Sequence, residues 1–301
     1  MVGTFPCRSE TFIAREIAAL EARGIEVMVF PLWRGDEDAA AGRAVERVGR
    51  WGVREQFLHM GKHVAWQLRF MGAWTQEGRG ALQALWHEGR MLAMGHRMRA
   101  LGVERVHAHF GNVVSTAGWM AADVAGVPFS LSVHARDVFV EPQFVREKAR
   151  AAVAVVACNS AAAASARELV GAVEAKKVVL VPHGILLDAY PLRGAAPSGV
   201  PLILAVGRLV EKKGFSYLLA AVARLRAAGR SFRAQIIGEG CERTALEREV
   251  ARALLGDVVT MPGWQLQEEV RRAMAEAAVL VAPRVVASDG DMDGLPNVLL
   301  E

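Results

Sequence analysis

Two carboxylates near the end of the chain, Asp293 and Glu301, are separated by seven residues that begin Gly-Leu-Pro. They follow a strand-like run, AVLVAP, and a polar loop. Pro296 suits the first position of a helix, where its missing N–H costs nothing, and Gly294 lets the backbone approach a ligand closely. The free N–H groups expected at this helix start belong to Leu295, Asn297 and Val298. The pattern predicts an anion site flanked by carboxylates that can bind hydroxyl groups, although an acidic N-cap is the competing interpretation of Asp293 alone.

The same segment also resembles the first half of a calcium-binding loop, because Asp289, Asp291 and Asp293 alternate ahead of a glycine. In such a loop a bidentate Glu stands at position 12 and a helix comes first. Counted from Asp289, Glu301 comes one residue too late, and a strand precedes the aspartates. The spacing therefore argues against calcium. We expect no metal site, and we expect Asp289 and Asp291 to shape the loop.

Two further turns stand between a strand-like run and a helix. In VGRLVEKKG, Arg208 and Lys213 bracket the turn and can bind one phosphate-bearing ligand, although an exposed basic loop would look the same. IIGEGCER lacks the third glycine of a dinucleotide fingerprint, so Gly238 is a weak signal on its own. We interpret this segment as a tight turn that brings backbone near a nucleotide.

The first half of the chain offers histidines at predicted strand ends. SVHARD places His134 and Asp137 after one run, and HAHFG places His109 after another. A single histidine is more often structural, but two at strand ends of one sheet favour a site. No Ser-His-Asp or Cys-His arrangement stands out, and no His/Cys cluster has metal-ligand spacing.

The wider pattern alternates buried strands with helices, which is typical of parallel α/β sheets. The predicted strands span 24–32, 105–110, 128–135, 152–160 and 177–184, then four more after a linker at 192–200. We therefore predict one α/β domain over 1–191 and a second over 201–301, with ligands bound in a cleft between them. The second domain is expected to be incomplete. The first is expected to be clipped, because only MVGTFP precedes its first helix.

The composition is that of a globular protein, with 52% hydrophobic and 23% charged residues. Three distant cysteines indicate neither a disulfide framework nor a zinc site, and a reducing, cytoplasmic compartment is expected. No signal peptide or membrane-spanning run is predicted. Between Arg43 and Arg105, eleven basic residues face five acidic ones, and four of the seven tryptophans lie there. Either this interval is a peripheral surface for anionic membrane, or it consists of arginine-rich faces over tryptophan cores.

In this order, SETFIAREIAALEARGIEVMVF, HAHFG, SVHARDVF, VGRLVEKKG, IIGEGCER and DGLPNVLLE resemble glycosyltransferase family 4. Within that family they are most similar to the colanic-acid and exopolysaccharide enzymes. The resemblance covers nearly the whole chain. It implies the GT-B fold, two facing Rossmann-like domains. It also implies a retaining, metal-independent transfer of a hexose from a UDP- or GDP-sugar to a growing, lipid-linked glycan. No cofactor and no nucleic acid partner are implied.

The resemblance also implies roles for individual residues. Arg208 and Lys213 match the pair that holds the donor diphosphate, and Asp293 and Glu301 match two carboxylates facing sugar and ribose. His134 matches a histidine near the reacting centre. Further donor-binding matches are Gly238, Trp264, Gln265, Gly294, Leu295 and Asn297. On the acceptor side we expect Ser9, Glu10, His109 and Asp137.

Three departures from the family pattern matter. The first carboxylate is Asp293 rather than Glu, Leu186 replaces a usual Asp, and the family continues beyond Glu301. A chain clipped at both ends is expected, and we expect it to be inactive alone. The alternatives are a nucleotide-sugar epimerase of the same architecture and a non-catalytic nucleotide-binding module.

Overall fold

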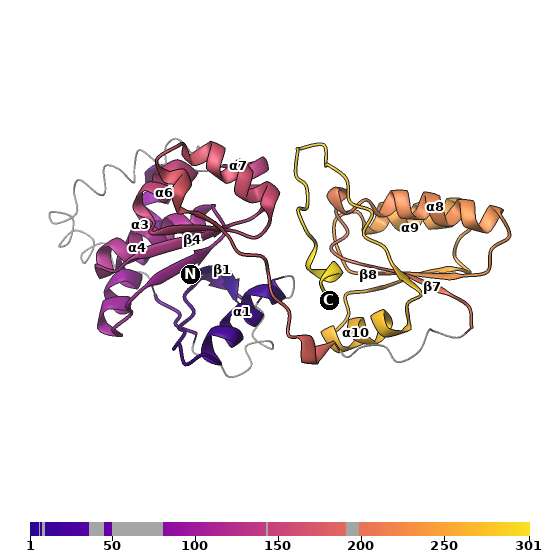
Figure 1. Cartoon of the computed structure of the whole chain (residues 1–301), viewed down its shortest axis with the longest axis horizontal. Helices are drawn as coiled ribbons and strands as arrows, with labels where there is room; N and C mark the ends of the chain where they lie inside the picture. The colour runs from indigo at the N-terminus through magenta and orange to yellow at the C-terminus, as the bar shows by residue number, and fades with distance from the viewer. Residues whose placement is uncertain (6, 8–9, 36–44, 50–80, 143, 191–198) are drawn as a thin grey trace. The chain divides into compact units, whose positions relative to one another are not determined.

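The computed structural model describes residues 1–5, 7, 10–35, 45–49, 81–142, 144–190 and 199–301, without the side chains of 34 and 81–87. The chain divides into two compact units, Met1–His183 and Gly184–Glu301 (Figure 1). Each unit contains a four-stranded parallel sheet, and each is described by itself below. The predicted α/β class with parallel sheets is confirmed.

The N-terminal unit carries two parallel sheets, one of strands β3-β4-β5-β6 in that order and one of β1-β2. Its strands are β1 (Val2–Phe5), β2 (Pro31–Arg34), β3 (Val106–His109), β4 (Phe129–Val133), β5 (Ala154–Ala157) and β6 (Val178–Leu180). Its helices are α1 (Thr11–Glu21), α3 (Ala81–Ala100), α4 (Val113–Ala125), α5 (Ala135–Phe139), α6 (Val145–Ala151), α7 (Ser160–Val170) and the 3₁₀ turn η2 (Glu174–Lys177). Parallel strands need crossover connections, so the carboxyl ends of β3 to β6 share one edge.

Two details near the start of the chain differ from the prediction. A strand, β1, precedes the first helix, and three of its four residues are buried. Within the predicted strand at 24–32, residues 24–26 are exposed and irregular, burial begins at Val29, and the ladder with β1 begins only at Pro31. Val29 and Phe30 are buried without regular pairing, and their carbonyl groups accept hydrogen bonds from Glu46 N and Val2 N. A run of apolar residues indicates a buried segment, but it does not by itself show that the segment pairs with another strand.

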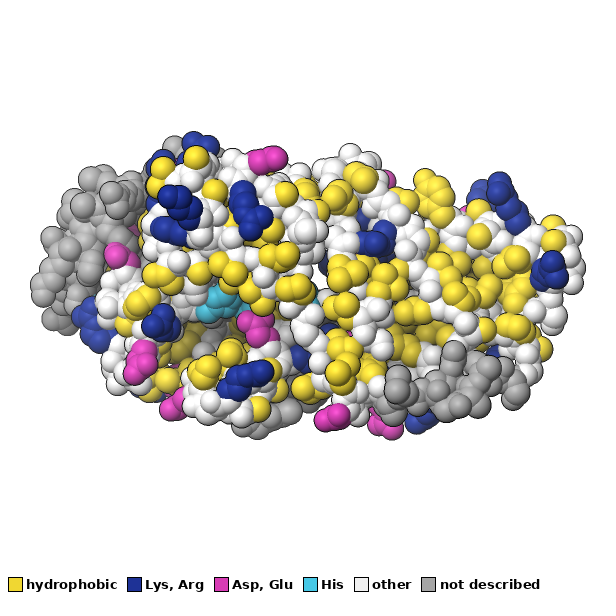
Figure 2. Space-filling view, in the orientation of Figure 1, with side chains coloured by type: hydrophobic (Ala, Val, Ile, Leu, Met, Phe, Trp, Pro, Cys, Tyr) yellow, Lys and Arg dark blue, Asp and Glu magenta, His cyan; other side chains and the backbone are white. Residues whose placement is uncertain are grey.

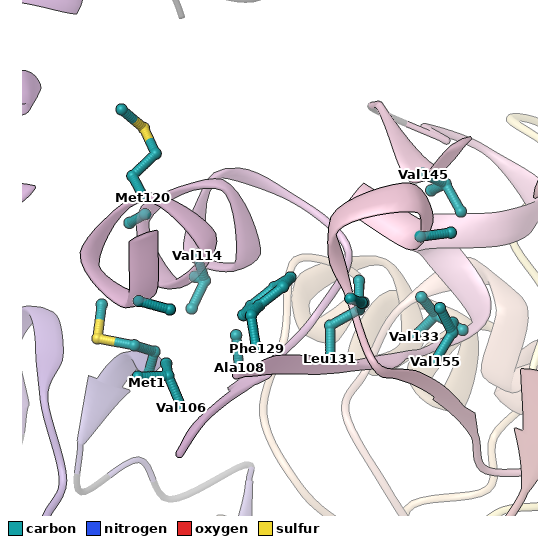
Figure 3. Packing of buried hydrophobic residues seen from close by; sticks show 14 of the residues in the cluster. Met1, Val106, Ala108, Val114, Met120, Phe129, Leu131, Val133, Val145 and Val155 are labelled. Carbon is teal, nitrogen blue, oxygen red and sulfur yellow. The ribbon is translucent and has the colours of Figure 1, made fainter. Parts of the chain in front are cut away.

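The core of this unit lies between the sheet and the helices that cover it. Figure 3 shows Ala108, Phe129 and Leu131 of the sheet with Met120 and Val114 of α4. In strand β4 the apolar side chains Phe129, Leu131 and Val133 are all buried. Their burial explains why this strand could be predicted from the sequence.

The C-terminal unit has one sheet, in the order β10-β7-β8-β9. Its strands are β7 (Leu202–Val206), β8 (Arg233–Ile237), β9 (Val259–Gly263) and β10 (Val279–Leu280). Its helices are α8 (Phe215–Ala227), α9 (Arg243–Arg252), α10 (Gln267–Glu276) and the 3₁₀ turns η3 (Leu187–Ala189), η4 (Glu211–Lys213) and η5 (Asn297–Leu299). From β7 the chain winds outward through β8 and β9, then returns to add β10 on the other side. The order therefore reverses between β7 and β10.

The surface of this unit is partly apolar. Figure 2 shows hydrophobic side chains gathered on its visible face, in the area where Figure 1 shows β7 and β8. Throughout the described part of the chain, no helix combines the length and the apolar character needed to cross a membrane.

Helices α3 and α4 pack closely at Gly95. A methyl group at this position would lie 2.5 Å from Val124 Cβ and 2.8 Å from the Ala121 carbonyl oxygen. Backbone oxygen cannot yield as a flexible side chain can, so the two helices would have to separate.

We therefore expect Gly95→Ala to destabilise the N-terminal unit by about 1–3 kcal/mol through overpacking. Helix propensity alone predicts the opposite sign, a gain of about 1 kcal/mol. Urea denaturation followed by circular dichroism would measure the change. Gly49→Ala is a control for the residue change alone, because no described residue lies within 4 Å of that added methyl group. A stabilised Gly95→Ala variant would show that the helices are not in contact there.

Candidate functional site

The reversal between β7 and β10 is where ligands bind in open parallel sheets, at the carboxyl ends of the strands. Two segments meet there. One is the turn after β7, residues 207–214, and the other is the segment after β10, residues 281–294. Gly214 has a φ of +66°, and a Cβ on it would lie 2.5 Å from the Pro283 carbonyl oxygen, so only glycine fits between the two segments.

Hydrogen bonds fasten the two segments together. Val285 N donates to Lys212 O at 3.0 Å. The Glu211 carboxylate accepts from the backbone N–H of Ser288 at 2.9 Å and from its hydroxyl at 2.7 Å. The loop after β10 is thus held against the turn after β7 by both backbone and side-chain contacts.

A compact charge cluster lies within this junction. Lys212 Nζ lies 2.9 Å from Asp291 Oδ2 and 3.3 Å from Asp293 Oδ1, and Lys213 Nζ pairs with Asp293 Oδ2. The Lys212 side chain is only 8% exposed, so this cation is held almost entirely by carboxylates. Burial alone would raise the pKa of the Asp293 carboxyl, but Lys213 and then Lys212 hold that pKa below its ordinary value.

The sequence analysis selected Arg208, Lys213 and Asp293, and the structure brings the last two into contact. Arg208 is exposed, and its side chain has no polar partner among the residues described. The analysis missed Lys212 and underestimated Asp291. The doubled lysine and the alternating aspartates were visible signals, but which lysine turns inward depends on the η4 turn. The Asp289 carboxylate accepts from Asp291 N at 2.9 Å, which is the expected loop-shaping role.

The prediction of a helix that starts at Pro296 is wrong. Only a 3₁₀ turn forms, η5, and Pro296 lies just ahead of it. Three residues align too few peptide dipoles to make the anion site of a helix N-terminus. Glu301 N donates to Asn297 O at 3.1 Å, and Leu295 is exposed. The Gly294 carbonyl oxygen accepts from the Arg284 guanidinium, a second cation that the sequence analysis missed.

The neighbouring strand ends carry the other predicted donor residues. Gly238, after β8, has a φ of +146°, and a Cβ there would lie 1.9 Å from the Gly207 carbonyl oxygen. This glycine is therefore required by contact between two turns, whatever ligand lies beside them. Trp264 follows β9 and is 41% exposed, and the Gln265 amide donates to Pro262 O at 3.3 Å.

In the N-terminal unit, nitrogen and sulfur donors line the carboxyl edge of the sheet. We call His109, His134, Cys158 and His183 the edge row. His109 ends β3, and the others follow β4, β5 and β6 within one to three residues. The rings of His134 and His183 stack at 5.6 Å, and Phe12 of α1 contacts both. The predicted pair of histidines at strand ends is thus part of a longer row.

The histidines of this edge are held neutral. Burial lowers the pKa of His107 to about 4, of His109 to about 2 and of His134 to about 3, with smaller contributions from neighbouring cationic groups. Burial also lowers the pKa of His183. At neutral pH these imidazoles can donate or accept a proton in a hydrogen bond, but they carry no charge.

Asp137 is buried, and its carboxylate Oδ2 accepts from His134 N at 2.8 Å. It fixes the start of α5 and with it the backbone of His134. The fully buried Lys148 Nζ donates to the carbonyl oxygens of Gly111 and Asn112 at 2.7 and 2.9 Å. Glu10 immediately precedes α1, and its N–H donates to Cys7 O. Ser9 lies outside the described residues.

Two groups of side chains on this unit offer atoms close enough to share a metal ion. They are His134 with Cys158 and His183, and Glu16 with His107 and His109. The search for metal spacing along the sequence could not find them, because their members come from different strands and helices.

Known proteins resemble the chain in sequence. Residues 200–301 match the family described as "Glycosyl transferases group 1". A colanic acid biosynthesis glycosyltransferase from Salmonella typhimurium is 26% identical over 99% of this chain and 77% of its own length. The amylovoran biosynthesis glycosyltransferase AmsK of Erwinia amylovora is 36% identical, over 42% of this chain and 31% of its own length.

Solved structures resemble this chain in fold. HepE of Anabaena, crystallised with UDP and glucose, superposes with a TM-score of 0.65 at 15% identity, over 94% of this chain and 73% of that one. The lipopolysaccharide outer core galactosyltransferase WaaB superposes with a TM-score of 0.58 at 16% identity, over 100% of this chain and 77% of that one. Both are GT-B glycosyltransferases, as the sequence motifs predict for this chain. The chain is therefore a glycosyltransferase, and it is similar to the exopolysaccharide-biosynthesis enzymes that the sequence motifs resemble.

Proposed function

We propose that the chain transfers a hexose from a UDP- or GDP-linked sugar to a growing, lipid-linked polysaccharide, without a metal ion and with retention of anomeric configuration. The observation that carries the donor half is the charge cluster at the reversal point of the C-terminal sheet. The sequence relatives act in colanic acid and amylovoran biosynthesis, and HepE was crystallised with UDP and glucose, which agrees with this donor class.

The cluster is suited to a diphosphate because its cations are held by carboxylates that a stronger anion can displace. Lys213 pairs with Asp293 at the mouth of the junction, while Lys212 lies deeper and binds both Asp291 and Asp293. Arg208 is exposed on the same turn. In this proposal a diphosphate takes Lys213 and Arg208, which releases the Asp293 carboxylate toward the sugar hydroxyl groups. Lys212 keeps Asp291 and the loop in place.

The chemistry requires the bond between the sugar C1 and the diphosphate oxygen to break. Negative charge then develops on the leaving diphosphate, and cations already in position lower the free energy of that step. The acceptor hydroxyl oxygen forms the new bond to C1, and its proton passes to the leaving diphosphate oxygen. His134 is proposed to serve this step as a neutral hydrogen-bonding group, with its backbone fixed by Asp137.

Donor binding tests the proposal. In calorimetric titrations with UDP, GDP and their sugars, we expect Lys213→Ala and Arg208→Ala each to weaken binding by about 1.5–3 kcal/mol, the strength of a charge-assisted hydrogen bond. Arg230→Ala is the matched control, because Arg230 is an exposed cation of the same unit with no side-chain partner among the described residues. Wild-type affinity in both variants would remove the diphosphate assignment.

The neutral state of His134 gives a test based on pH. Its pKa is about 3 in the folded unit and about 6.5 when exposed, so the unfolded state binds the proton more readily. This contribution to stability is complete above about pH 6.5 and is lost as pH falls toward the folded-state value. We expect the free energy of unfolding to fall less steeply between pH 6.5 and 4 in His134→Asn than in the parent. Parallel pH profiles from urea denaturation would contradict the lowered pKa.

A lipid-linked acceptor would bring the enzyme to a membrane surface, and the charge of residues 43–105 supports this. Most of that interval lies outside the described residues. Anionic lipid attracts basic segments and salt screens the attraction. In sedimentation with liposomes, we expect binding to anionic vesicles, weakened by salt, and little binding to neutral ones. Equal recovery with both vesicle types would leave these arginines with an ordinary solvent-facing role.

A further inference from the structure

Three members of the edge row come from three neighbouring strands. His134 follows β4, Cys158 follows β5 and His183 lies three residues beyond β6. Parallel pairing in the order β4-β5-β6 brings these positions together, and each residue offers a nitrogen or sulfur atom within 4.8 Å of the other two.

Imidazole nitrogen and thiolate sulfur are the ligands that Zn²⁺ prefers. Zn–S bonds of about 2.3 Å and Zn–N bonds of about 2.0–2.1 Å in a tetrahedral site place ligand atoms roughly 3.3–3.8 Å apart. Side-chain shifts of about 1 Å would therefore close this site. The backbone is fixed at two of the three positions, because the Asp137 carboxylate holds His134 N and Asn159 caps α7 directly after Cys158.

A second observation points to a ligand at the same place. His134 Nε2 is enclosed, and it has no hydrogen-bond partner within the described ranges. A buried polar atom without a partner is costly, and a bound ion is one of the ordinary explanations. His134 and His183 both have lowered pKa values, so they present the neutral imidazole that metal binding needs. Burial raises the pKa of the Cys158 thiol, and a cation would displace its proton on binding.

The other candidate group is less suitable. Both ring nitrogens of His107 are already engaged at 2.9 Å, one with the Ser130 hydroxyl and one with that of Ser132. Its imidazole could bind a metal only by giving up one of these contacts. The choice between the two groups thus depends on hydrogen bonding, and it favours the group that contains Cys158.

We propose that His134, Cys158 and His183 form a binding site for a soft divalent cation, with Zn²⁺ as its preferred probe and a fourth position left to solvent. A cation bound there engages His134, and glycosyl transfer then stops. The inhibition of glycosyl transfer depends on the function proposed above, whereas cation binding does not.

Binding is tested on the full chain with Co²⁺, which reports a thiolate ligand by a charge-transfer absorption band, followed by displacement with Zn²⁺. We expect the band in the parent and its loss in Cys158→Ser. His183→Asn should weaken Zn²⁺ binding at least roughly tenfold, since even outer-sphere changes at zinc sites cost about 10–100-fold. Cys7→Ser and Cys241→Ser are matched controls that should keep both the band and the affinity, because neither cysteine belongs to the site.

Several results would overturn the proposal. Absence of the band in the parent would do so without any variant, and so would unchanged Zn²⁺ affinity in folded Cys158→Ser and His183→Asn proteins. The inhibition step has its own test, in which Zn²⁺ should reduce transferase turnover and a chelator should restore it. Binding that needs all three residues while turnover continues would overturn inhibition alone. A parent that binds Zn²⁺ but binds neither UDP, GDP nor any of their sugars would count against the proposed function and not against the metal site.

Discussion

Parallel strand pairing is the constraint on which both sites depend. Strands that run the same way must be joined by crossovers, so every carboxyl end in a sheet meets at one edge. In the N-terminal unit this rule places four donors from distant parts of the sequence in a single row. In the C-terminal unit it places the turn after β7 beside the loop after β10, although about seventy residues separate them. The strand order alone therefore brings the functional residues of each site to one edge of a sheet.

The charge cluster shows how such an edge is stabilised. Lys212 is nearly buried, and a buried cation is tolerated only when carboxylates and carbonyl groups surround it. Asp291 and Asp293 supply that environment, and Glu211 binds Ser288 on the outside. The loop is therefore held by ion pairs and hydrogen bonds.

The strands that could be predicted from the sequence were rich in buried apolar residues, such as β7, where these residues run without interruption, and β4, where they alternate with serines. The short β1 was missed because four residues give no period to read, and 24–32 was misassigned because buried extended backbone has the same composition as a strand. In the candidate site, Lys213 and Asp293 were found from their places beside a turn. Lys212 could not be distinguished from Lys213, since the inward direction is set by the 3₁₀ geometry of η4. The grouping of Cys158 with His183 was also invisible, because only the strand order makes them neighbours.

The contact between Gly238 and Gly207 has a consequence for how this enzyme can change over evolutionary time. The two turns touch backbone to backbone, with space for no side chain between them. Mutation can therefore neither enlarge nor decorate this part of the wall without separating β7 from β8. Variation in what the unit recognises must come from positions that tolerate new side chains, such as exposed Trp264 after β9. Selection for a different ligand would leave Gly238 fixed and act on exposed positions such as Arg208 and Trp264.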